Sequence, residues 1–174
     1  MPSAVIDALL EVAPVFSGFD PEDRHALLET AVEETYAAGL EIISPGQPAL
    51  SMFVLAEGTV EVLESSNSGE PMTLAILIPP CTFGELAFFE AGTHGVTVRT
   101  VTPVRLLSIE RVGFDRLLAQ QTLAAYKLAL NVLVNLGNRL RRVDVWVAQQ
   151  WNAGDRTKQQ WNDFRAKLYQ EWEL

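Results

Sequence analysis

Residues 83–100 read FGELAFFEAGTHGVTVRT, and this run carries the strongest structural signal in the chain. Gly84 precedes a short apolar segment, which predicts a glycine turn leading into a single turn of helix. The unpaired N–H groups at a helix start favour an anion, and a residue without a Cβ lets a ligand approach the backbone closely. The run is therefore compatible with an anion-binding turn that begins at Gly84.

Glu85 is difficult to explain by packing alone. It stands between Phe83 and Leu86, where an unpaired carboxylate would be costly to bury. A sugar hydroxyl would satisfy this carboxylate by donating a hydrogen bond, and so would water or a surface arginine. Gly-Glu-Leu by itself therefore fits a ligand site and equally fits an ordinary structural turn.

Three further segments resemble parts of one protein family, and they follow in the family's order and at similar spacing. They are PVFSGFD at 14–20, GLEIISPGQPA at 39–49 and MFVLAEGTVEV at 52–62. Together with residues 83–100, they resemble the cyclic-nucleotide-binding domain family over about residues 10–148. The resemblance implies a mainly β fold with flanking helices, a double-stranded β-helix or jelly-roll-like β-roll followed by a long C-terminal helix. It also implies that cAMP or cGMP binds between the roll and that helix.

The resemblance also implies roles for individual residues. Gly84, Leu86 and Ala87 would offer backbone donors to the cyclic phosphate, and Glu85 would hold the ribose hydroxyl. His94 stands where the family places an arginine that pairs with the phosphate. An imidazole cannot copy the two-pronged contact of a guanidinium, so we expect affinity to be about ten- to a hundredfold lower. The predicted ligand-binding residues are Gly84, Glu85, Leu86, Ala87, His94, Gly95 and Thr97.

Charge is distributed unevenly along the chain. Residues 1–98 hold one basic side chain, Arg24, and 15 acidic ones, whereas residues 99–174 hold 12 basic and 7 acidic. A phosphate bound within the first part would meet a negative field, with only His94 and Arg99 nearby to offset it. Arg99 also fits an outward position on the strand that follows the run.

Composition narrows the classes of protein to which the chain can belong. The chain has 174 residues, of which 48% are hydrophobic, which suits one well-buried core. A single cysteine, Cys81, cannot form an internal disulfide, so we expect a cytoplasmic protein. The sequence shows no leader and no apolar stretch of membrane-spanning length, so we expect no membrane span. It also shows no cluster of metal ligands, no paired acids and no nucleophile beside a base, so we expect no metal and no enzymatic activity.

Helices are expected at both ends of the chain and strands between them. Asp20 followed by Pro21 predicts a helix start, and we expect the apolar face of this helix, residues 26–28 and 31–32, to pack against the strands. Between residues 33 and 110, short alternating runs are separated by glycine or proline. This pattern favours an antiparallel roll over a parallel sheet.

Residues 121–150 have the spacing of one long helix with two apolar stripes. One stripe would cover the roll and leave the other exposed, which favours a homodimer through this helix, although a single chain could bury both. We expect a first domain at 1–150 and an amphipathic tail helix at 151–174. The first stripe consists of Tyr126, Leu130, Leu133, Gly137, Leu140 and Val147. The second consists of Leu128, Val132, Leu136, Val143 and Trp146.

The tail is too short for the DNA-binding helix-turn-helix of catabolite-activator-type regulators. A net charge of −9 also argues against a nucleic-acid surface. Trp161, Phe164, Leu168 and Trp172 share one predicted face, which would pack within the chain or contact a protein partner. Two hypotheses therefore remain: a stand-alone cyclic-nucleotide sensor, or a dimeric protein-interaction module whose pocket holds no nucleotide.

Overall fold

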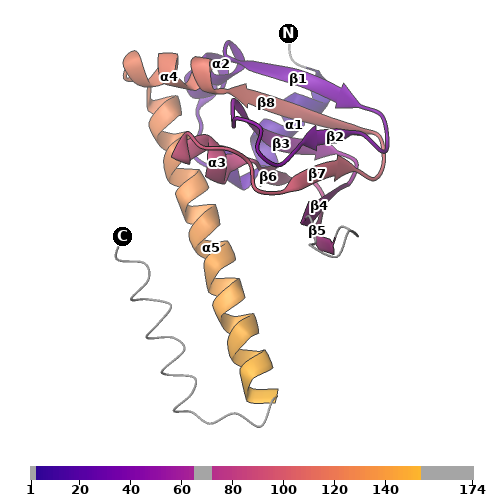
Figure 1. Ribbon diagram of the computed structural model, residues 1–174. Coiled ribbons are helices and arrows are strands. Elements are labelled where there is room, and N and C mark those ends of the chain that lie inside the picture. The colour runs from indigo at the N-terminus through magenta and orange to yellow at the C-terminus, as the bar shows by residue number, and fades with distance from the viewer. Residues whose placement is uncertain (1–2, 65–71, 154–174) are drawn as a thin grey trace. The chain divides into compact units, whose positions relative to one another are not determined.

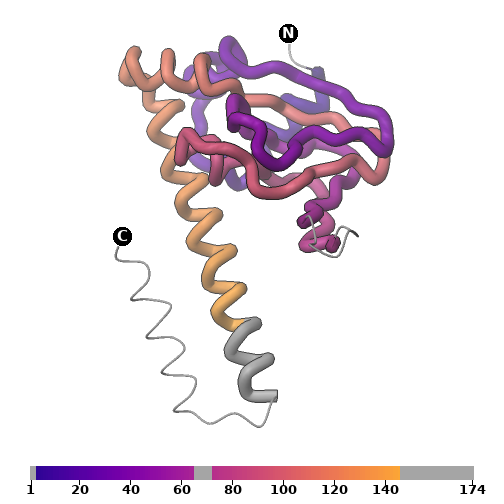
Figure 2. The backbone as a smooth tube through the Cα atoms, in the orientation of Figure 1, coloured from indigo at the N-terminus to yellow at the C-terminus, as the bar shows by residue number. Residues whose placement is uncertain are grey.

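The computed structural model describes residues 3–64 and 72–153, with side chains up to residue 145. Figure 2 follows the backbone of residues 3–64 and 72–145 in colour. The chain divides into two compact units, Met1–Val132 and Leu133–Leu174. All of the strands in the described part belong to the first unit, and the boundary between the units falls within the last described helix.

The first unit begins with helices. Helix α1 (Ala4–Val12) is capped by the Ser3 hydroxyl, and a short 3-10 turn, η1 (Pro14–Phe16), follows it. Helix α2 (Pro21–Leu28) starts with a capping box between Asp20 and Asp23, which confirms the predicted start. The expectation that residues 31–32 extend its apolar face is wrong, because they begin a strand and Val32 is 47% exposed.

Within the described residues, eight strands form two antiparallel sheets of four, which confirms the β-roll (Figure 1). The first sheet has the order β1 (Ala31–Tyr36), β8 (Val104–Glu110), β3 (Ser51–Glu57) and β6 (Cys81–Phe83). The second has the order β2 (Glu41–Ile43), β7 (Thr97–Thr100), β4 (Val60–Glu64) and β5 (Met72–Leu77). Three more helices complete the described part: α3 (Glu85–Glu90), α4 (Arg111–Ala119) and α5 (Leu123–Ala153).

The hydrophobic core lies between the two sheets. Phe53 and Phe83 stack near its centre, with ring centroids 5.3 Å apart. On its opposite side the first sheet is covered by helices, since α1 contacts β3 and α4 contacts β8. Burial on both faces explains why β3 and β8 are apolar nearly throughout, whereas a half-exposed strand would alternate.

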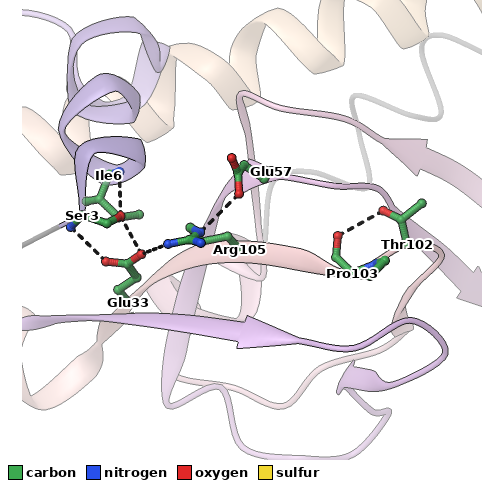
Figure 3. Close-up of polar contacts among 7 residues, drawn as sticks. All are labelled: Ser3, Ile6, Glu33, Glu57, Thr102, Pro103 and Arg105. Carbon is green, nitrogen blue, oxygen red and sulfur yellow. Dashed lines mark hydrogen bonds and ion pairs between the residues drawn. The ribbon is translucent and has the colours of Figure 1, made fainter.

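A polar network joins the first residues of the chain to the first sheet (Figure 3). Arg105 of β8 donates to Glu33 of β1 over 2.8 Å and to Glu57 of β3 over 3.2 Å. The Ser3 hydroxyl and amide also donate to Glu33, at 2.6 and 3.1 Å. These hydrogen bonds, that of the Ser3 hydroxyl foremost, lower the pKa of Glu33 below its usual value.

In the first part of α5 one of the two apolar stripes is buried, and polar contacts join this part to the N-terminal helices. Leu128 and Val132 are buried, whereas Tyr126 and Leu130 are exposed. Polar contacts reinforce this packing: Lys127 binds the buried carboxylate of Asp23, and the side chain of Asn131 donates to the carbonyls of residues 15 and 17. The predicted division into a covered and an exposed stripe is therefore confirmed up to residue 132.

Beyond residue 132 the covered stripe does not continue unchanged, since Val143 is 54% exposed. The side chains of Trp146 and Val147, and the tail at 154–174, lie outside the described residues. The predictions of an amphipathic tail helix and of a domain boundary at residue 150 therefore remain predictions.

Truncating Leu128 tests the packing of α5. Leu128→Ala removes a fully buried side chain and should lower the free energy of unfolding by about 2–5 kcal/mol. Urea unfolding followed by circular dichroism measures this change. Val112→Ala is the control, because Val112 is 71% exposed on α4 and should change stability by no more than about 0.5 kcal/mol. Equal effects of the two substitutions would contradict the observed packing.

Candidate ligand-binding site

The glycine turn predicted at residue 84 is present. Strand β6 ends at Phe83, Gly84 adopts a left-handed backbone with φ of 77°, and α3 begins at Glu85. A Cβ placed on Gly84 would lie 3.1 Å from Ile43 Cδ1 and 3.6 Å from His94 Cε1. The left-handed backbone thus favours glycine, and a Cβ would also crowd the Ile43 side chain, whereas the sequence predicts this glycine from ligand approach alone.

The segment that follows α3 returns along the turn at residues 46–49. The amide of His94 donates to the Gln47 carbonyl over 2.9 Å, and the Gly46 amide donates to the His94 carbonyl over 2.8 Å. The Ala49 amide donates to the Gly92 carbonyl over 3.0 Å. These three hydrogen bonds fix the backbone of His94 opposite the start of α3. We name residues 83–97, from the end of β6 to the start of β7, the cassette.

His94 is the cassette residue whose surroundings are best defined. Its side chain stands against Gly84, and the residue is only 9% exposed. Burial lowers the pKa of the imidazole below its usual value of 6.5, so the ring is neutral at pH 7. The hydrogen bonds that join His94 to other described residues run through its backbone, and its ring nitrogens are not among the buried polar atoms that lack a partner.

The other predicted site residues have different environments. Glu85 and Ala87 are buried, at 3% and 8% exposure, whereas Leu86 is 59% exposed at the surface. Gly95 is exposed, and a Cβ placed there would meet nothing within 4 Å. Thr97 is half-buried at the start of β7, opposite Leu63 of β4. The structure therefore places Gly84 beside His94, and it places Thr97 at the start of β7.

An aromatic cluster anchors α3 to α4, and the sequence analysis missed it. Phe88 and Phe89 both meet Phe114 edge to face, with ring centroids 5.6 and 5.4 Å from it. Arg111 lies over the Phe88 ring, donates to the Phe88 carbonyl and pairs with Asp115 at 3.0 Å. The adjacent Phe88 and Phe89 could have indicated such a cluster, but their partner, Phe114, lies more than 20 residues further along the chain.

Arg99 does not serve the cassette. Its guanidinium binds Glu61 through two nitrogens, at 2.9 and 2.7 Å, across the β4–β7 pair. This arrangement confirms the interpretation of Arg99 as an outward strand residue. One of the two cations expected to offset a bound phosphate is therefore already paired, and the other, His94, is neutral.

Two surface hollows lie away from the cassette. One of about 450 Å³ lies between α1 and the Pro79–Pro80 segment and is mainly apolar. The other, of about 540 Å³, lies beside α2 and β1 and includes His25, Glu29 and Glu33. Neither contains a predicted site residue, so the cassette remains the candidate site.

No group of three or more potential metal ligands gathers within the described residues. Cys81, at the start of β6, is partly buried. None of the described helices is long and apolar enough to cross a membrane.

Comparison with known proteins bears on the cassette directly. Residues 33–121, slightly more than half of the chain, match the family described as the cyclic nucleotide-binding domain. The chain is 26% identical over 139 residues to a CRP-like cAMP-activated global transcriptional regulator of Mycobacterium tuberculosis. That match covers 80% of this chain and 60% of the regulator, so the chain spans less than two thirds of its relative's length.

Solved structures show the same architecture. The catabolite activator protein of Thermus thermophilus aligns with a TM-score of 0.67 at 26% identity, covering 79% of this chain and 62% of that one. A regulatory subunit of a cAMP-independent protein kinase A from Trypanosoma cruzi, bound to guanosine, aligns with a TM-score of 0.59 at 26% identity. That alignment covers 65% of this chain and 40% of the trypanosomal one.

The buried imidazole predicts a pH dependence of stability. The pKa of His94 is lower in the folded protein than in the unfolded chain, so the unfolded chain takes up the proton first as pH falls. The free energy of unfolding should therefore be highest above about pH 6.5 and should fall as pH drops below that value. Urea unfolding at pH 7.5 and 5.5 measures the loss.

His94→Gln should abolish this part of the loss between pH 7.5 and 5.5. His25→Gln is the matched control, because the His25 side chain is 79% exposed. The control protein should retain the wild-type pH dependence. A His94→Gln protein that loses as much stability as the wild type would contradict the assignment.

Proposed function

Since the chain belongs to the cyclic nucleotide-binding domain family, we propose that it is a regulatory sensor module whose cassette binds cAMP or cGMP, and binds it weakly. The observation that carries this proposal is the arrangement of three residues. A left-handed Gly84 opens α3, the buried carboxylate of Glu85 follows, and the neutral imidazole of His94 stands against the glycine.

The start of α3 supplies the backbone donors. The N–H groups of Glu85, Leu86 and Ala87 lie in the first turn of the helix, where no carbonyl of the helix can accept from them. In the proposed complex these groups face the cyclic phosphate, and Glu85 accepts from the ribose hydroxyl. His94 contributes one neutral hydrogen bond in place of an arginine fork, which accounts for the weak binding.

The aromatic cluster gives the ligand a route to the long helix. Movement of α3 on ligand docking would act on α4 through Phe114 and Arg111. Only three residues separate the end of α4 from the start of α5. We therefore propose that occupancy of the cassette is transmitted through α4 to the beginning of α5.

One observation favours a second class of ligand for the same site. The trypanosomal kinase regulatory subunit that aligns with this chain is bound to guanosine, a nucleoside without a phosphate. A nucleoside keeps the sugar hydroxyls that Glu85 would accept from, and it makes no demand for an arginine.

Calorimetric titration with cAMP and cGMP tests the sensor function. We expect weak binding to the wild type and an affinity about ten- to a hundredfold higher for His94→Arg, because the guanidinium restores a charge-assisted contact. His25→Arg adds the same charge at an exposed position and should leave the affinity unchanged. Absence of heat with the wild type and with a folded His94→Arg protein would favour an interaction module without a nucleotide.

We further propose a parallel homodimer through the exposed stripe of α5. Leu130 and Leu133 are 61% and 65% exposed, and Tyr126 and Leu140 extend the same stripe. An apolar stripe of this length is unusual on an isolated monomer, and a second copy of the same helix would cover it symmetrically.

Leu130→Asp should convert the proposed dimer to a monomer, because it places a charge within the apolar stripe. Light scattering coupled to size-exclusion chromatography at tens of micromolar measures the mass. Val112→Asp is the control, since it makes the same kind of change at an exposed apolar position on α4. A monomeric wild-type protein would rule out the dimer.

A further inference from the structure

Strand β5 exposes apolar side chains along its whole length. Leu77 packs against the core between the sheets, as expected of an inward residue. Four alternate residues are also apolar, yet each is between 47% and 65% exposed: Met72, Leu74 and Ile76 in the strand, and Ile78 directly after it. We name these four residues the β5 stripe. The exposed side of an antiparallel sheet ordinarily carries polar residues, so an apolar run of this kind indicates a contact surface.

The backbone of β5 is open as well, because β5 is an edge strand of the second sheet (Figure 1). It pairs with β4, and no described residue outside this pair forms a backbone hydrogen bond with residues 72–78. Edge strands are usually protected by charged residues, proline or a bulge. Residues 72–78 contain no charge and no proline, and a register shift interrupts the pairing with β4 at Leu74. The regular edge from Ala75 to Leu77 can therefore accept a further strand.

An apolar hollow lies close to the end of this edge. Its volume is about 450 Å³, and its wall includes Pro79 and Pro80, which follow Ile78 directly. Residues of α1, among them Ala8 and Val12, complete the wall. When an extended segment adds to a sheet edge, backbone hydrogen bonds supply affinity and a side-chain pocket supplies specificity. The hollow is such a pocket for a strand that continues past the end of β5.

The charge around β5 is negative. Glu64 of β4, opposite Met72, is exposed and forms no ion pair with a described residue. More widely, residues 1–98 hold 15 acidic side chains and one basic. A second copy of the chain would bring two acidic surfaces together at this edge, whereas a partner with basic residues would be attracted to it. Charge complementarity therefore favours a basic partner over self-association.

We infer that β5 binds an extended segment of a partner protein, which adds as a strand to the second sheet. The described pairs of that sheet are antiparallel, and the added strand follows the same rule. The segment thus begins with an apolar side chain in the hollow, places alternate apolar residues on the β5 stripe and ends with basic residues beside Glu64. This surface lies outside the cassette, so the inference goes beyond the proposed function and does not depend on nucleotide binding.

Fluorescence anisotropy of a labelled synthetic peptide tests the inference on the full chain. The peptide begins with leucine, continues with alternating valine and threonine, and ends with two lysines. We expect binding that weakens about three- to tenfold when glutamates replace the lysines. A proline at the central valine should abolish binding, because it removes an N–H from the ladder. Absence of binding at high-micromolar concentration, or equal binding of the proline peptide, would overturn the inference.

Two protein variants locate the peptide. Ile76→Lys places a charge in the β5 stripe and should weaken binding about tenfold or more. Val112→Lys adds the same charge at an exposed apolar position on α4 and should leave binding unchanged. Ala8→Phe fills the hollow, so it should weaken binding of the peptide that begins with leucine and leave a peptide that begins with glycine unaffected. Equal effects of Ile76→Lys and Val112→Lys would contradict the assignment to β5.

Hydrogen exchange of the wild-type protein gives a readout that needs no variant. The peptide should slow exchange of backbone amides within residues 72–78, whereas β1, an edge strand of the other sheet, should keep its rates. Protection of β1 without protection of β5 would overturn the inference. A concentration-dependent mass that Ile76→Lys lowers and Leu130→Asp does not would assign this edge to a second copy and refute the basic partner.

Discussion

The antiparallel pairing of β3 with β8 is the constraint on which the rest of the first unit depends. Alternation along the pair sends Leu55 and Leu106 into the core between the sheets, and Val54 and Leu107 toward the helices. Because both faces are covered, this pair can tolerate few polar side chains. Arg105 avoids burial at the end of β8 by reaching Glu33 and Glu57 at the edge of the pair.

The candidate site is attached to the same strand pair. Strand β6 pairs with β3 through Phe53 and Phe83, and the turn at Gly84 follows directly. At the other end of α3, the contacts with Phe114 and Arg111 lead to α4, which packs on β8. The cassette therefore lies between the central strands and the helices that lead to α5, a position suited to a regulatory module.

Electrostatics distinguishes this cassette from a phosphate site built around arginine. Two arginines of the sheets are held in ion pairs: Arg99 on β7 binds Glu61 on β4, and Arg105 on β8 binds Glu33 and Glu57. Burial lowers the pKa of His94, so its ring is neutral at pH 7. No carboxylate forms an ion pair with this ring in the described part of the chain. The backbone geometry of the family is thus combined with a site of low positive charge.

Local periodicity and backbone preference were sufficient for the capped start of α2 at Asp20, the turn at Gly84 and the two stripes of α5 up to residue 132, and the family resemblance supplied the β-roll. Local patterns could not locate the end of α2, because the apolar residues 31–32 fit a helix as well as a strand. Their pairing with β8 makes them part of β1. Only the tertiary structure decided that Arg99 binds Glu61, that Phe114 meets α3 and that His94 is buried. These are contacts between segments distant in sequence, and their existence depends on packing that no local pattern encodes.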